Sequence, residues 1–95
     1  MTITKSVTFI AKEGSEAKMK ELLSAMVVPS KAEEGCLFYE IFQYENDRRR
    51  FMAVETWESA KALDGHKTSV HYGIYKASYE PYCDKKYTDE LEVLK

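Results

Sequence analysis

Two neighbouring stretches of this chain carry large apolar side chains at odd and even positions alike. Residues 36–45 read CLFYEIFQYE, and residues 50–57 read RFMAVETW. Because side chains alternate between the two faces of a strand, both stretches are apolar on both faces if they are extended. A strand of this kind is usually covered on both sides. In a chain of 95 residues one helical layer can cover one face, so the other face needs a further partner, most simply a second copy of the sheet.

The first third of the chain predicts a strand followed by a helix. Residues 3–11 alternate between apolar and polar side chains, which is typical of a half-buried strand. With Ser15 as the expected N-cap, one apolar stripe then predicts an amphipathic helix: Met19, Leu22, Leu23, Met26 and Val27. Pro29 should interrupt this helix. The capping-box spacing of Ser30 and Glu33 predicts a helical restart that Gly35 ends.

The rest of the chain predicts a hairpin, a second helical region and a last strand. Residues 46–48 (Asn-Asp-Arg) form a turn by residue type between the two apolar strands. Ser69 is a candidate N-cap for a helix that Pro81 stops, and residues 85–94 predict a terminal strand. The order β-α-β-β-α-β over residues 1–95 predicts one domain of the α+β class with a ferredoxin-like fold.

Composition excludes several classes of partner. The net charge of −2 and the pI of about 5.7 argue against binding to nucleic acid or to a membrane surface. No apolar run approaches the roughly 18 residues of a membrane span. The first residues read as a strand rather than a signal peptide, so a cytoplasmic location is expected. Cys36 and Cys83 match no metal-binding spacing and are expected to be free thiols.

Residues 55–72 (ETWESAKALDGHKTSVHY) contain both histidines and the single tryptophan of the chain. A strand would place Glu55 and Trp57 on one face, because side chains alternate with period two. A short helix and a turn could then fold His66 and His71 back over that face. One carboxylate, two imidazoles, an indole and the phenol of Tyr72 would converge there, so this stretch is the candidate site.

The same residues carry a resemblance to a known family. They are Glu34-Gly35-Cys36 at the start of the second strand, Glu55-Thr56-Trp57-Glu58-Ser59 at the end of the third, and then Ala62-Leu63, His66 and Ser69-Val70-His71-Tyr72. Together they resemble the antibiotic biosynthesis monooxygenase (ABM) domain family over nearly the whole chain. Around residues 66–72 the chain is similar to the quinol monooxygenases and to the isomerases that process autoinducer-2 phosphate.

The resemblance implies a fold, an assembly and a site. It implies a ferredoxin-like protomer that pairs its sheet with a second copy to form a dimeric α+β barrel, which agrees with the two-sided strands. It also implies a cavity for a small-molecule substrate between sheet and helices, and no cofactor. The implied reaction is a monooxygenation of a small quinol-like or polyphenol substrate, although domains of this kind host several chemistries.

Residue chemistry then suggests a role for each side chain. A substrate that itself donates electrons to dioxygen must lose a proton, and a histidine suits the base. The hypothesis makes His66 the base, Glu55 its orienting carboxylate and His71 a hydrogen-bond donor to substrate oxygens. The expected substrate-binding residues are Tyr72, Trp57, Tyr75 and Tyr39, with Trp57 as an apolar or stacking wall.

Other interpretations stay open. The histidines and Tyr72 could move protons in an isomerase for a phosphorylated keto-sugar, with Lys67 near the phosphate. The chain could instead be a dimeric binding module without turnover, or the Glu–His pair could be purely structural. No metal is expected, because two histidines and a carboxylate can form a facial triad in principle but nothing in the spacing singles one out.

Overall fold

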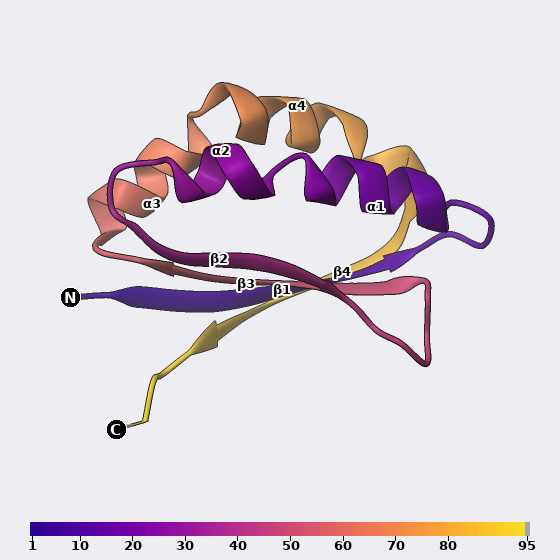
Figure 1. Cartoon of the computed structure of the whole chain (residues 1–95), viewed down its shortest axis with the longest axis horizontal. Coiled ribbons are helices and arrows are strands. Elements are labelled where there is room, and N and C mark those ends of the chain that lie inside the picture. Colours follow the sequence, from indigo (N-terminus) through magenta and orange to yellow (C-terminus); the bar gives the residue numbers. More distant parts are fainter. Residues whose placement is uncertain (95) are drawn as a thin grey trace.

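The computed structural model describes residues 1–94 and confirms the predicted order of elements. The elements are β1 (Ile3–Ala11), α1 (Glu16–Ser24), α2 (Val27–Lys31), β2 (Cys36–Gln43), β3 (Arg50–Trp57), α3 (Ala60–Lys67), α4 (Val70–Ser78), the 3-10 turn η1 (Glu80–Tyr82) and β4 (Cys83–Leu91). In the described part of the chain, four antiparallel strands form one sheet in the order β2-β3-β1-β4. The helices all lie over one face of this sheet (Figure 1). This is the ferredoxin-like α+β fold.

The register of the strands determines which side chains meet the helices. Val7 on β1 lies opposite Ala53 on β3 and Thr88 on β4, so these three share a face. The buried core forms between that face and the helices, from Val7, Phe9, Ala11, Tyr39, Phe51, Ala53 and Trp57 of the strands and Met19, Leu23, Met26 and Tyr75 of the helical layer. The alternation in residues 3–11 therefore predicted the inward face correctly. Residues 50–57 are apolar on both faces, and in the structure the buried set is Phe51, Ala53, Glu55 and Trp57.

Local capping explains how the chain enters the two helices beyond β3. The hydroxyl of Ser59 accepts a hydrogen bond from the Ala62 amide, and that of Ser69 accepts one from the Tyr72 amide. Each bond satisfies an amide of the first helical turn that has no partner within the helix. The two caps place the end of α3 and the start of α4 next to each other, which brings His66 and His71 together.

Ser15 is the N-cap residue of α1 as predicted, although its side chain makes no capping hydrogen bond. Two local predictions were wrong. The break before Pro29 falls at residues 25–26, and Pro29 lies inside α2, where the first turn tolerates it. Ser30 is also inside α2, so it is not the cap of a later helix, and Glu33 is free to take another role.

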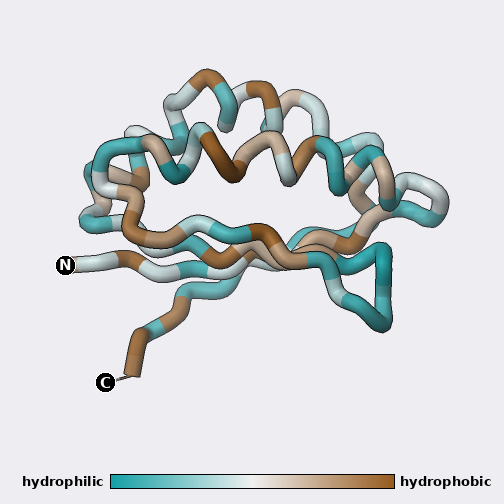
Figure 2. The backbone as a smooth tube through the Cα atoms, in the orientation of Figure 1, coloured by the Kyte–Doolittle hydropathy of each residue, from teal (hydrophilic) through white to brown (hydrophobic). Residues whose placement is uncertain are grey.

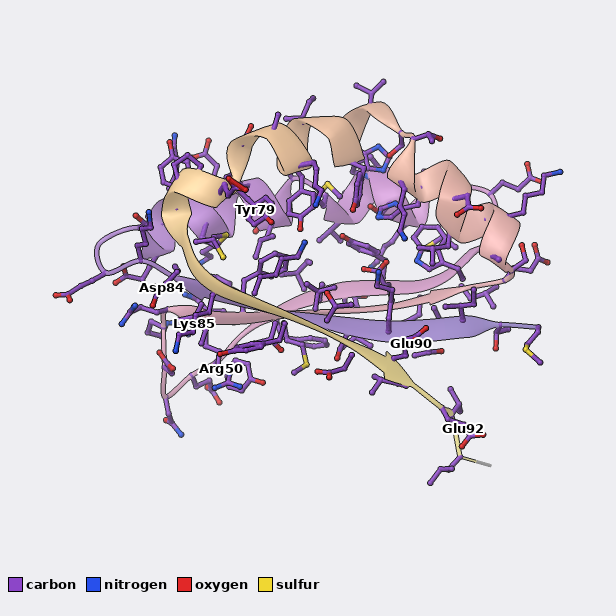
Figure 3. The ribbon with its side chains drawn as sticks, turned by 180° about the vertical axis from the view of Figure 1, so that it is seen from behind. Arg50, Tyr79, Asp84, Lys85, Glu90 and Glu92 are labelled. Atoms are coloured by element: carbon purple, nitrogen blue, oxygen red, sulfur yellow. The ribbon has the colours of Figure 1, made fainter. Side chains whose placement is uncertain are left out.

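Within residues 1–94, no element covers the outer face of the sheet (Figure 1). Apolar side chains stand exposed on this face or at its edge, among them Phe38, Phe42, Tyr87 and Leu91. Arg50 lies on the opposite side of the sheet from Tyr79 (Figure 3). The connection between β2 and β3 is strongly hydrophilic and forms the corner of the molecule (Figure 2). Within residues 1–94 no helix has both the length and the apolar character to cross a membrane.

Gly35 provides a test of the turn that leads into β2. Its φ of +84° is favourable for glycine, and an added Cβ would lie 2.5 Å from the Cβ of Ala62. We expect Gly35→Ala to lower the free energy of unfolding by about 2–3 kcal/mol, from backbone strain and displacement of α3. Gly73→Ala is the control, because a Cβ there meets nothing within 4 Å. It should be neutral or stabilising by up to about 1 kcal/mol in urea unfolding. Equal effects of the two variants would contradict this account.

Candidate functional site

A cavity lies between the sheet and the helices, with a volume of about 50 Å³. Its walls include Tyr39 from β2, Glu55 from β3, His66 from α3, Tyr72 and Tyr75 from α4, and Lys86 from β4. Helices and strands that are far apart in the sequence therefore build one site. Five of the seven residues predicted for catalysis or substrate binding line this cavity: Tyr39, Glu55, His66, Tyr72 and Tyr75.

His66 is the central side chain of this site. It lies in the last turn of α3 and is only 2% exposed. Its ring packs against Trp57 at 4.5 Å between ring centroids, with an interplanar angle of 32°. Tyr72 meets it edge-on at 5.1 Å, and Tyr39 lies at 5.7 Å. These aromatic rings fix the plane of the imidazole.

Glu33 holds both histidines, which the sequence did not predict. Its Oε2 lies 2.6 Å from Nδ1 of His66 and 2.7 Å from Nε2 of His71. Glu33 belongs to the turn between α2 and β2, and its backbone bonds to Ser30 and Cys36 anchor it there. The carboxylate bound to His66 is thus that of Glu33, and the prediction that Glu55 orients this imidazole is wrong.

Glu55 has a different partner. It is 5% exposed, and its Oε1 accepts a hydrogen bond of 2.9 Å from Nε1 of Trp57. Trp57 is completely buried, packs its ring against that of His66 and does not line the cavity, so the predicted stacking wall for substrate is also corrected. The two residues share a face as predicted, and that proximity leads them to bind each other.

His71 is placed by Glu33 and not by the cavity. Its Nε2 also lies 3.2 Å from the Ser69 hydroxyl, which donates to the carbonyl of His66. His71 does not line this cavity, and its predicted contact with substrate oxygens stays a prediction. It is a second partner for the carboxylate that orients His66.

The hydrogen bonds determine the tautomer of His66. An ionised carboxylate can only accept, so Nδ1 of His66 must carry the proton that points at Glu33. In the neutral ring the lone pair is then on Nε2. Since Nδ1 is bound to Glu33 and the ring lines the cavity, Nε2 is the nitrogen available to a ligand.

Two further lining residues, Tyr75 and Lys86, contact the ring of Tyr79, which itself does not line the cavity. Tyr75 and Tyr79 stack at 5.0 Å with an angle of 17°, and the Nζ of Lys86 lies 5.6 Å and 5.0 Å from their rings. Burial, with Lys76 and Lys5 nearby, lowers the pKa of Lys86. Burial also raises the pKa of Tyr39 and of Tyr75, so both phenols are hydrogen-bond donors at neutral pH.

The sequence matches the pattern of a known family. Residues 2–77 match the family described as antibiotic biosynthesis monooxygenase. The chain belongs to the antibiotic biosynthesis monooxygenase family.

Two related proteins extend this finding to sequence and structure. The ABM chain is 33% identical over 69 residues to the protein named "Putative monooxygenase Rv0793" of Mycobacterium tuberculosis, a match that covers 73% of this chain and 67% of the relative. The solved structure of PA3566 from Pseudomonas aeruginosa has a TM-score of 0.94 at 30% identity and covers 99% and 95% of the two chains. The structure of Rv0793 has a TM-score of 0.92 at 25% identity and covers 100% and 97%.

The family and the names of its relatives support a monooxygenase-like activity, and so an oxidoreductase, for this ABM protein. They do not identify the substrate.

The buried tyrosines predict an alkaline loss of stability. Since burial raises the pKa of Tyr39 and Tyr75 in the folded ABM domain, the unfolded chain releases these protons first as the pH rises through about 10. The free energy of unfolding should therefore fall between pH 9 and pH 11, by at most about 1.4 kcal/mol per pH unit for each tyrosine. Urea unfolding at several pH values measures this slope.

Tyr75→Phe should make that alkaline slope shallower, because it removes one of the two buried phenols. Tyr44→Phe is the matched control, since Tyr44 is exposed. An unchanged slope in Tyr75→Phe would show that this phenol does not couple to folding.

Proposed function

We propose that the protein is a cofactor-independent monooxygenase for a small polyphenol or quinol-like substrate, working in the cytoplasm as a homodimer. The observation that carries the proposal is the His66 imidazole, held at Nδ1 by Glu33 and lining an aromatic cavity. The base needs a fixed lone pair within reach of a phenolic proton, and this arrangement supplies one at Nε2. The free thiols of Cys36 and Cys83 support a reducing compartment.

The proposed reaction begins with proton removal. Nε2 of His66 takes the proton of a phenolic hydroxyl, and the ring anion donates electrons to dioxygen. A carbon–oxygen bond forms at a ring carbon, and the imidazolium gives its proton to the outer peroxide oxygen, which yields a hydroperoxide. His66, neutral again, takes the proton of that ring carbon as the O–O bond breaks and then passes it to the leaving hydroxide. A phenol and dioxygen yield a quinone and water, so the substrate supplies all four electrons.

The charges around the cavity favour a substrate anion. Lys5, Lys67 and Lys86 all line it. Ammonium groups near a phenol stabilise the phenolate, which lowers the cost of the first proton transfer. The cavity is narrow, and Lys86 covers the Tyr75 and Tyr79 rings, so we expect an aromatic ligand to displace this lysine from them.

Oxygen uptake on a panel of hydroquinones and dihydroxynaphthalenes tests the base directly. We expect uptake by metal-stripped wild type and a loss of about 10²–10⁴-fold in kcat for His66→Asn, the usual contribution of a general base. Asparagine can keep an N–H toward Glu33 while it removes the nitrogen in the position of Nε2. Circular dichroism and the unfolding midpoint confirm that the variant is folded.

Glu34→Gln is the control for this experiment, because Glu34 is exposed and lies outside the cavity wall. Uptake that persists in His66→Asn would contradict the role of His66. Ligand binding without uptake by the wild type would instead indicate a binding module.

A second candidate function has a specific observation in its favour. The same three lysines could hold a phosphate, as required of an isomerase for a phosphorylated keto-sugar. His66 and Tyr72 would then move protons across an enediolate. Turnover of phosphorylated sugars that falls in Lys67→Ala, together with no oxygen uptake on phenols, would favour this function.

The homodimer is proposed from the uncovered face of the sheet. Phe42 is 51% exposed there, and Phe38 is 44% exposed. A second copy would cover these apolar side chains, which water solvates poorly. We expect a dimer by light scattering at micromolar concentration and a monomer for Phe42→Asp. Val28→Asp, at a site that is 77% exposed on the helical side, should remain dimeric. A monomeric wild type would overturn the proposal.

A further inference from the structure

Glu33, His66 and His71 form a compact group of side chains. The reaction proposed above uses this group only to orient His66. One possible ligand atom from each lies within 4.8 Å of the other two. The three come from separate segments: the turn before β2, the end of α3 and the start of α4. The side chain of His66 is 2% exposed, and those of Glu33 and His71 are 16% and 19% exposed. The group is therefore shielded but open to solvent on one side.

Two imidazoles and one carboxylate are a ligand set for divalent transition metals. Zinc sites with an open position use two histidines and a glutamate, with ligand atoms about 2.0–2.2 Å from the ion. Tetrahedral ligands at that distance are roughly 3.4 Å apart. Oε2 of Glu33 now lies 2.6–2.7 Å from the two nitrogens, so an ion requires the carboxylate to withdraw by less than about 1 Å. Glu33 is in a turn, where such a movement is easiest.

We propose that Glu33, His66 and His71 bind a divalent transition-metal ion of the zinc class at Oε2, Nδ1 and Nε2. Water completes the coordination on the exposed side. Each imidazole keeps one proton, which moves from the nitrogen that binds the ion to the other nitrogen of the same ring. For His66 the proton moves from Nδ1 to Nε2.

This movement has a consequence that rests on the proposed function. With the ion on Nδ1, Nε2 of His66 carries hydrogen and no longer accepts a proton. The ion therefore inhibits a reaction in which His66 is the base. The metal site and the active cavity share one imidazole, and occupancy of the first switches off the second.

Binding is tested on the full chain after removal of metals by chelation. Titration calorimetry with Zn²⁺ should give one ion per chain, and Co²⁺ should give the visible absorption of a low-coordinate site. Glu33→Gln and His71→Gln should each bind at least about tenfold more weakly. Glu34→Gln is the matched control and should bind as the wild type does. Absence of saturable binding, or equal binding in Glu33→Gln and Glu34→Gln, would overturn the site.

Oxygen uptake in the same titration tests inhibition separately. The expected result is a loss of uptake that follows Zn²⁺ occupancy in the wild type and needs at least tenfold more Zn²⁺ in His71→Gln. Uptake that stays constant or rises at full occupancy would overturn the inhibition. Stoichiometric binding by a protein that shows no uptake in the metal-free form would support the site while the proposed function fails. Circular dichroism ensures that weak binding is not a result of unfolding.

Discussion

The carboxylate of Glu33 is the contact on which the rest of the site depends. One oxygen accepts from two imidazoles, and in doing so it ties the turn before β2 to the facing ends of α3 and α4. Hydrogen bonds to a charged group contribute about 1.5–3 kcal/mol each, more than a neutral pair. The two imidazole donors satisfy the hydrogen-bonding capacity of this Glu33 oxygen, and the same two bonds fix the orientation of both histidine rings. The same bonds determine which nitrogen of His66 is available.

The parts of this arrangement that depend on local sequence were predictable. Alternation in residues 50–57 placed Glu55 and Trp57 on one face, and the hydroxyls of Ser59 and Ser69 cap α3 and α4. These signals operate over two or three residues, and the order of the elements followed from them. The contact between Glu33 and His66 spans 33 residues and follows from the packing of a turn against a helix. No spacing pattern in the sequence predicts a contact over this distance along the chain.

The error over Glu55 shows why a shared face is not enough to assign a partner. Residues at i and i+2 of a strand are close, so Glu55 meets the indole of Trp57 before it can meet a side chain from another layer. The capping-box spacing of Ser30 and Glu33 predicts that Glu33 caps a helix start, yet Ser30 lies inside α2. Because Ser30 is inside a helix, its amide is not a capping partner for Glu33, and the Glu33 carboxylate binds the two histidines instead. Two local misassignments thus concealed one tertiary contact.

The two ring nitrogens of His66 have separate roles: Nδ1 binds Glu33, and Nε2 is available for proton transfer in the cavity. Nδ1 belongs to Glu33, and Nε2 is the nitrogen left for the cavity, so whatever occupies the first determines the protonation of the second. A proton on Nδ1 makes Nε2 a base, and a cation on Nδ1 makes it a donor. The ring is packed against Trp57 and Tyr72 and cannot turn to exchange the two nitrogens without disturbing buried neighbours. The partner of Nδ1 therefore determines whether Nε2 accepts or donates a hydrogen bond to a ligand in the cavity.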